Sequence, residues 1–281
     1  MTVTETATPS RAVATLTPRS PGPARLRKRR APLLGVLGSL GFLVLWQIVV
    51  QFEMLPRNYL PSASDAVAQA AMLLTNGQFL GEVGSTVGVS FLGLGIAFVI
   101  AAPLGLMLGI SERLYALTST VVELLRPLPP IAFVPLMVLV AGQGVEMKAT
   151  IVALGCVWPL LTNTIHGVHA TEAVAKATGE SFGWGKWTVI RRVVWPSSLP
   201  SVITGVRITV SIALILCVGA EFIGGSTRGI GSWLLQQSML PGGMLSVTAG
   251  VLIAGALGVV VNAIVAVLDR RYAAWARRGE S

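Results

Sequence analysis

The chain has 281 residues, of which 53% are hydrophobic and only 12% are charged, and its mean hydropathy is +0.74. This balance excludes an ordinary soluble domain, in which about a quarter of the residues carry charge. The net charge of +9 does not indicate nucleic-acid binding, because the basic residues gather just outside apolar segments instead of alternating with aromatic ones. A membrane protein with several spans of roughly 20 apolar residues each is therefore predicted.

Residues 1–31 are rich in Thr, Ser, Pro and Ala, and carry many basic residues but a single acid, Glu5. We interpret them as a disordered cytoplasmic tail, with a transit peptide as the alternative on composition and a signal peptide as a weaker one. The uncharged apolar run 33–50 predicts the first span, with Trp46 and Gln47 near its far end as an interface anchor. A polar loop with one surface helix is expected over 51–82, followed by a second span over 83–110.

The third apolar stretch, 114–141, predicts a kinked or interrupted span. It contains Glu123, Arg126 and four prolines, which an undistorted helix does not accept. The fourth span is predicted at 149–164, the fifth at 201–222 and the sixth at 244–268, with a glycine-rich loop between the last two. Pairs and clusters of glycines predict faces for close helix packing: Gly84 and Gly88; Gly105 and Gly109; Gly250, Gly255 and Gly258.

The positions of the basic residues predict the topology. With the amino terminus in the cytoplasm, most Lys and Arg residues fall on the inside, and only Arg57, Lys148 and Arg228 fall on the outside. Both termini and the long polar segment 166–200 are then cytoplasmic. The expected organisation is a cytoplasmic tail (1–31), one all-α transmembrane domain with about six helices (32–269) and a C-terminal tail (270–281).

Metal chemistry is not predicted. Cys156 and Cys217 lie inside apolar runs and are expected to be small core residues. His166 and His169 fall on one helix face where the fourth span meets the cytoplasm, but no third ligand accompanies them, so they are expected to be interface residues.

The cytoplasmic stretch 173–207 predicts a helix, a glycine turn at Gly183 and a second amphipathic run that leads through Pro196 and Pro200 into the fifth span. It is basic and contains Trp184, Trp187 and Trp195. Two interpretations stay open on composition: an element lying on the membrane surface, or a docking surface for another protein.

This stretch resembles the cytoplasmic loop of ABC-importer permeases, in which a Glu-Ala-Ala triplet is followed by Gly and later by Pro; Gly183 and Pro196 fall at that spacing. Further stretches, in the same order, resemble permeases for nitrate, taurine and alkanesulfonates. These stretches are Leu60-Pro61-Ser62, Arg126-Pro127-Leu128-Pro129-Pro130-Ile131-Ala132, Asn163-Thr164-Ile165-His166-Gly167-Val168, Leu199-Pro200, Thr204-Gly205-Val206-Arg207, Ala220-Glu221 and Gly229-Ile230-Gly231.

The resemblance implies a loop that couples the chain to an ATPase, formed by Ala177, Thr178, Gly179, Glu180, Gly183 and Pro196. The chain departs from the family at the triplet, where Ala177, Thr178 and Gly179 replace the usual residues and the acid is missing; Glu180 follows. Any salt bridge that the usual Glu forms is therefore in question.

The resemblance also implies the type I ABC-importer permease fold and a multi-pass location in the bacterial plasma (inner) membrane. The implied partners are a second permease copy in a homodimer, two copies of an ABC ATPase subunit and an extracytoplasmic substrate-binding protein. The chain itself contains no Gly-x-x-x-x-Gly-Lys-Ser/Thr motif, so ATP and Mg²⁺ are expected on the partner ATPase. The chain is expected to be no enzyme and to bind no cofactor.

Ionisable groups inside the membrane cost about 2.5–3.5 kcal/mol each at a helix centre, so they call for a reason. Arg126, Pro129 and Pro130 are candidates for the translocation pathway, where Arg126 would meet an anion; the alternative for Arg126 is packing against Glu123. Glu221 is the fourth candidate pathway residue, although a structural hydrogen-bonding or gating role fits its position at the outer end of the fifth span better.

The predicted function is import of a small organic or inorganic anion, similar to a sulfonate, taurine or nitrate, powered by the separate ATPase. The main alternative is a secondary transporter or channel that works without ATP, which would share the broken helix and the intramembrane charges. A protein of that class works without an ATPase, so it needs no docking segment at 173–207. A membrane scaffold would explain the helices but not the proline-rich third span.

Overall fold

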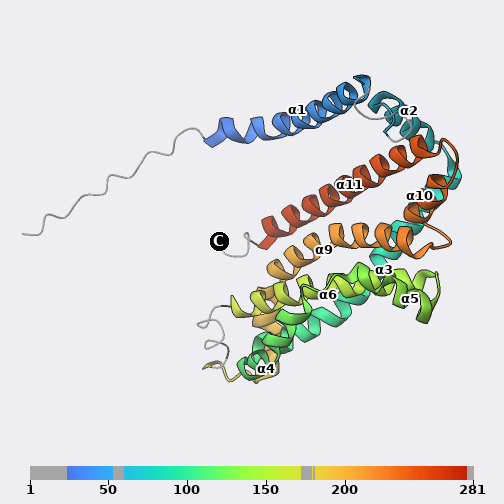
Figure 1. Cartoon of the computed structure of the whole chain (residues 1–281). Helices are drawn as coiled ribbons and strands as arrows, with labels where there is room; N and C mark the ends of the chain where they lie inside the picture. Colours follow the sequence, from blue (N-terminus) through green and yellow to red (C-terminus); the bar gives the residue numbers. More distant parts are fainter. Residues whose placement is uncertain (1–23, 53–59, 172–178, 180, 277–281) are drawn as a thin grey trace, which may run out of the picture.

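The computed structural model describes residues 24–52, 60–171, 179 and 181–276, and Figure 1 shows a bundle of long helices. No strand occurs in these ranges. The helices are α1 (Ala24–Gln51), α2 (Ala63–Leu73), α3 (Gly77–Ile110), α4 (Glu112–Leu125), η1 (Pro130–Phe133), α5 (Val134–Ala141), α6 (Val145–His169), α8 (Lys186–Val189), η2 (Ile190–Val194), α9 (Trp195–Gly224), α10 (Ile230–Ser238) and α11 (Met244–Ala276).

Four described helices are long and apolar enough to cross a membrane: α3, α6, the helix that runs through Lys186–Gly224, and α11 over Met244–Val267. The predicted third span is broken, as expected: α4 and the segment Pro130–Ala141 meet at 74°, and together they would make a fifth span. The predicted first span lies within α1, whose described apolar part is Leu40–Gln51.

Two loops contain more helix than the sequence indicated. The surface helix expected within 51–82 is α2, but α3 begins at Gly77, before the predicted 83, because the Asn76 side chain caps it by accepting from the Gln78 and Phe79 N–H groups. The segment that the sequence predicts as a glycine-rich loop between the fifth and sixth spans contains a further helix, α10. Gly229 starts this helix with a backbone conformation that only glycine adopts easily.

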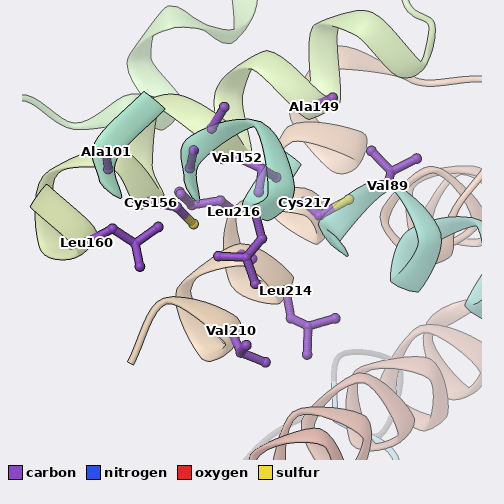
Figure 2. Packing of buried hydrophobic residues seen from close by; sticks show 14 of the residues in the cluster. Val89, Ala101, Ala149, Val152, Cys156, Leu160, Val210, Leu214, Leu216 and Cys217 are labelled. Atoms are coloured by element: carbon purple, nitrogen blue, oxygen red, sulfur yellow. The ribbon is translucent and has the colours of Figure 1, made fainter. Parts of the chain in front are cut away.

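The core lies where α3, α6 and α9 run side by side (Figure 1). Figure 2 shows Val152 and Cys156 of α6 gathered with Leu216 and Cys217 of α9, and Val89 contributes from α3. Both cysteines are free and buried, which confirms their prediction as core residues. The apolar faces of three helices thus meet in one cluster, and they hold the framework on which the sites below are built.

Glycines let α3 approach α6 closely. A Cβ atom built at Gly105 would lie 2.6 Å from the Cβ of Thr164, and one at Gly109 would lie 2.6 Å from the Cβ of Val168. This confirms the predicted packing face at 105 and 109. The face predicted at Gly84 and Gly88 is different, since a Cβ there meets nothing within 4 Å among the described residues.

Gly105→Ala is expected to destabilise the bundle by about 1–3 kcal/mol, because the added methyl group forces α3 away from α6. Equilibrium unfolding in mixed detergent micelles measures the effect. Gly95→Ala on the same helix is the matched control, because a Cβ at Gly95 meets nothing within 4 Å, and it should leave stability unchanged or raise it. Equal stability of the two variants would contradict the close packing of α3 on α6.

Candidate functional site

A buried ion pair joins α6 to α9. The Lys148 ammonium lies 3.3 Å from the Glu221 carboxylate, and their side chains are 2% and 0% exposed. Glu221 also accepts hydrogen bonds from the Thr86 hydroxyl of α3 at 2.9 Å and from the Gly231 N–H of α10 at 3.0 Å. Lys148 donates a second bond to the Arg228 carbonyl at 2.8 Å. Each charge is thus paired and hydrogen-bonded, which offsets the cost of burying it.

The loop before α10 closes over this pair. The Ile230 N–H donates to the Thr86 hydroxyl at 2.8 Å, and the Gly229 N–H donates to the Glu82 carboxylate. A Cβ at Gly229, where φ is 125°, would lie 2.1 Å from a Glu221 carboxylate oxygen, and a Cβ at Gly231 would lie 2.1 Å from the Val218 carbonyl oxygen. Both positions therefore require glycine, which explains the Gly-Ile-Gly motif physically.

We call Thr86, Lys148, Glu221, Gly229 and Gly231 the ion-pair cluster. Sequence reasoning selected Glu221 but placed Lys148 only in an outer loop, whereas Lys148 belongs to the first turn of α6 and is 1% exposed. A signal was available, because a charged residue in an apolar span requires a partner of opposite charge at the same depth. Lys148 and Glu221 both stand at the outer ends of their predicted spans.

Arg126 lies at the bend of the broken span. It follows α4 directly, while Pro129 and Pro130 form the start of η1. Its side chain lines a small pocket of about 120 Å³ between α4 and α6, together with Glu123, Tyr115 and His166. Arg126 and Glu123, both described, form no ion pair within 4.0 Å with each other. The exposed guanidinium is therefore free to meet an anion.

The four residues predicted for the pathway do not gather in one place within the chain. Arg126 lines the pocket, Pro129 and Pro130 shape the bend beside it, and Glu221 belongs to the ion-pair cluster. Lys148 lies in the first turn of α6 and His166 in its last turn. The cluster and the pocket are therefore separated by roughly 27 Å along that helix at about 1.5 Å per residue. The described residues contain no group of three possible metal ligands.

The predicted glycine turn in the stretch 173–207 is present. Gly183 has a φ of 74°, and the Trp184 N–H donates to the Gly179 carbonyl at 3.1 Å, which closes the end of a helix in the manner of a Schellman motif. Phe182 stands beside the turn with 76% of its surface exposed. Of the predicted coupling residues, Ala177, Thr178 and Glu180 lie outside the described residues.

Pro196 does not separate this stretch from the fifth span. The helix is continuous through Lys186–Gly224, and the turn before Pro196 widens to a π-helix in which the Trp195 N–H donates to the Ile190 carbonyl. A proline lacks the N–H group and collides with the preceding turn of an α-helix, and a wider turn relieves both effects. The end of this stretch and the fifth span therefore form one continuous helix.

Residues 101–274 match the family described as "Binding-protein-dependent transport system inner membrane component". A protein of Methanocaldococcus jannaschii named as an ABC transporter permease is 32% identical over 64% of this chain and 67% of its own length. The aliphatic sulfonates transport permease SsuC of Bacillus subtilis is 28% identical, covering 89% of this chain and 90% of its own.

The bicarbonate transport system permease CmpB of Synechococcus elongatus is 27% identical, over 88% of this chain and 93% of its own. Among solved structures, an inward-facing form of the MetNI methionine ABC transporter has a chain that superposes with a TM-score of 0.61. The two are 16% identical, and the match covers 69% of this chain and 95% of that one. At this identity the likeness concerns the fold, which is that of a type I importer permease.

Proposed function

Because this chain belongs to the family of binding-protein-dependent transport system inner membrane components, we propose that it imports a small anion with energy from a separate ATPase. It is a permease subunit of an ABC transporter and a multi-pass membrane protein, and its relatives are transport permeases, not enzymes.

The proposed assembly contains two copies of this permease, two ATPase subunits that bind ATP and Mg²⁺, and an extracytoplasmic substrate-binding protein. The coupling segment, residues 166–200, would dock on the ATPase in the cytoplasm, and both termini would lie on the same side. The exposed ring of Phe182 beside the rigid Gly183 turn supports this role, since large aromatic side chains often anchor protein interfaces.

The observation that carries the substrate class is the exposed guanidinium of Arg126 in its pocket between α4 and α6. A guanidinium recognises carboxylate-like and sulfonate-like oxygens through two parallel hydrogen bonds. The pocket volume of about 120 Å³ suits a small anion or the head of a larger one. Two of the relatives are named for the anions that they transport, aliphatic sulfonates and bicarbonate.

Arg126→Gln is expected to lower uptake roughly tenfold or more, because a hydrogen bond to a charged group contributes about 1.5–3 kcal/mol. Uptake and ATP hydrolysis are measured in proteoliposomes that hold the chain with its ATPase, after addition of binding protein loaded with a sulfonate, taurine, nitrate or bicarbonate. The variant should retain basal ATP hydrolysis, since Arg126 lies outside the coupling segment. Arg113→Gln, an exposed arginine of α4 outside the pocket, is the matched control.

Two outcomes would count against the proposal. Unchanged uptake by Arg126→Gln, for every anion that the wild type carries, would remove Arg126 from the pathway. Flux driven by an ion or proton gradient through the chain alone, with no ATPase bound, would replace the importer by a secondary transporter.

A further inference from the structure

An apolar groove runs along one side of α3 and consists of two neighbouring cavities. The first, of about 630 Å³, lies between α3, α9 and Val265 of α11, and neither charged nor polar side chains line it. Its walls include Phe91 and Gly95 of α3 and Val206 of α9. The second, of about 530 Å³, shares Phe98 with the first and continues along α3 as far as Leu106. We call the two together the α3 groove.

One end of the α3 groove is different from the rest. There the second cavity is lined by Trp187, Arg191 and Trp195, and Arg191 is the one charged residue in the lining of either cavity. Tryptophans concentrate where a membrane protein crosses from hydrocarbon to head groups, and arginine binds phosphate through its planar fork of N–H donors. The groove thus combines a long apolar wall with a cation at its mouth.

Arg192, the next residue after Arg191, lies in a different environment from Arg191. The Arg192 guanidinium lies 5.4 Å from the centre of the Trp184 ring, over its face, in a cation–π contact. Arg192 is absent from the lining of the groove. Of two adjacent arginines in the same helical turn, one therefore stacks on the Trp184 ring and the other faces the apolar groove.

We propose that the α3 groove binds a phospholipid with an anionic head group, whose phosphate lies at Arg191 and whose acyl chain follows α3. From Phe91 to Leu106 the groove runs roughly 22 Å along the helix at about 1.5 Å per residue. One leaflet of the hydrocarbon core is about 15 Å thick, half of roughly 30 Å, so a whole acyl chain fits. The charge of Arg191 complements the head group, and the lining complements the chain.

This site is separate from the proposed anion pocket, with which it shares no lining residue. Its occupant would touch both α3 and the part of the coupling segment that leads into α9, at Trp187, Arg191 and Trp195. A lipid in the groove would therefore link the segment that we expect to meet the ATPase to the core of the bundle.

The test measures phospholipid bound to the full-length chain, purified without ATPase, binding protein or substrate, so that its result does not depend on the transport proposal. Chain reconstituted in nanodiscs is titrated with doxyl-labelled phosphatidylglycerol or phosphatidylcholine, and quenching of tryptophan fluorescence reports occupancy near Trp187 and Trp195. Wild type is expected to prefer phosphatidylglycerol. Arg191→Gln should reduce that preference about fivefold, since one arginine near a lipid surface contributes about that factor.

Gly95→Leu is the second variant. A Cβ at Gly95 meets nothing within 4 Å, so the leucine fills the groove without disturbing the packing and should lower occupancy for both lipids. Arg192→Gln and Ile96→Phe are matched controls, because neither residue lines the groove, and both should bind as wild type.

Two results would overturn the proposal. If wild type and Arg191→Gln each bind phosphatidylglycerol and phosphatidylcholine with equal affinity, no head-group site exists at Arg191. Loss of a chain dimer in Gly95→Leu, with lipid binding unchanged, would assign the groove to a second copy of the chain.

Discussion

Lys148→Met should lower the free energy of unfolding by about 3–5 kcal/mol, because removing one partner leaves the other charge buried and uncompensated. The Glu221 carboxylate would lose the ammonium at 3.3 Å in a site where its side chain is 0% exposed. The hydrogen bond from Lys148 to the Arg228 carbonyl would be lost as well, which loosens the loop before α10. Equilibrium unfolding in mixed micelles, followed by tryptophan fluorescence, measures the loss.

Arg228→Met is the matched control, since this exposed residue contributes only its backbone carbonyl to the cluster. Its stability should stay within about 0.5 kcal/mol of the wild type. The double variant Lys148→Met with Glu221→Gln should lose less free energy of unfolding than the two single variants lose together, by about 0.5–3 kcal/mol. The amide still accepts from the Thr86 hydroxyl and the Gly231 N–H, but carries no charge. Strict additivity would mean that the two charges do not stabilise each other.

Phe182→Glu should weaken binding of the ATPase about thirtyfold, because an aromatic anchor at an interface contributes roughly 2 kcal/mol or more. The ring is 76% exposed at the Gly183 turn, so the substitution removes apolar contact area without disturbing the interior of the chain. Titration of the purified ATPase against the detergent-solubilised chain gives the affinity. Phe52→Glu, at a phenylalanine that is 73% exposed just after α1, controls for the loss of a surface aromatic residue.

Unchanged ATPase affinity in Phe182→Glu would return the stretch to its other interpretation, an element that lies on the membrane surface. Contact of residue 182 with lipid, measured on the whole chain reconstituted in liposomes, separates the two cases. If the stretch lies on the membrane surface, the substitution Phe182→Glu removes residue 182 from the membrane. If the stretch is a docking element, the substitution has no such effect.

Local patterns in the sequence were sufficient for much of the bundle. Apolar runs located the helices, and the prolines between Arg126 and Pro135 predicted the broken third span, because proline removes a backbone donor wherever it stands. The turn at Gly183 was likewise predictable, since glycine adopts a positive φ at little cost. The ordered motifs between residues 60 and 231 indicated the permease family, which the match over residues 101–274 then established.

Other features were decided by the tertiary structure alone. Lys148 and Glu221 are 73 positions apart, so their pairing depends on how α6 packs on α9 and leaves no periodic trace in the sequence. Whether a glycine serves packing depends on what lies opposite, and Gly105 faces Thr164 while Gly95 opens onto a groove. Arg191 and Arg192 are adjacent and chemically identical, yet one faces the groove and the other a tryptophan ring. The sequence determines which residues lie in helices, because hydrophobicity and backbone propensity are local, whereas the partner of each side chain depends on contacts between distant segments.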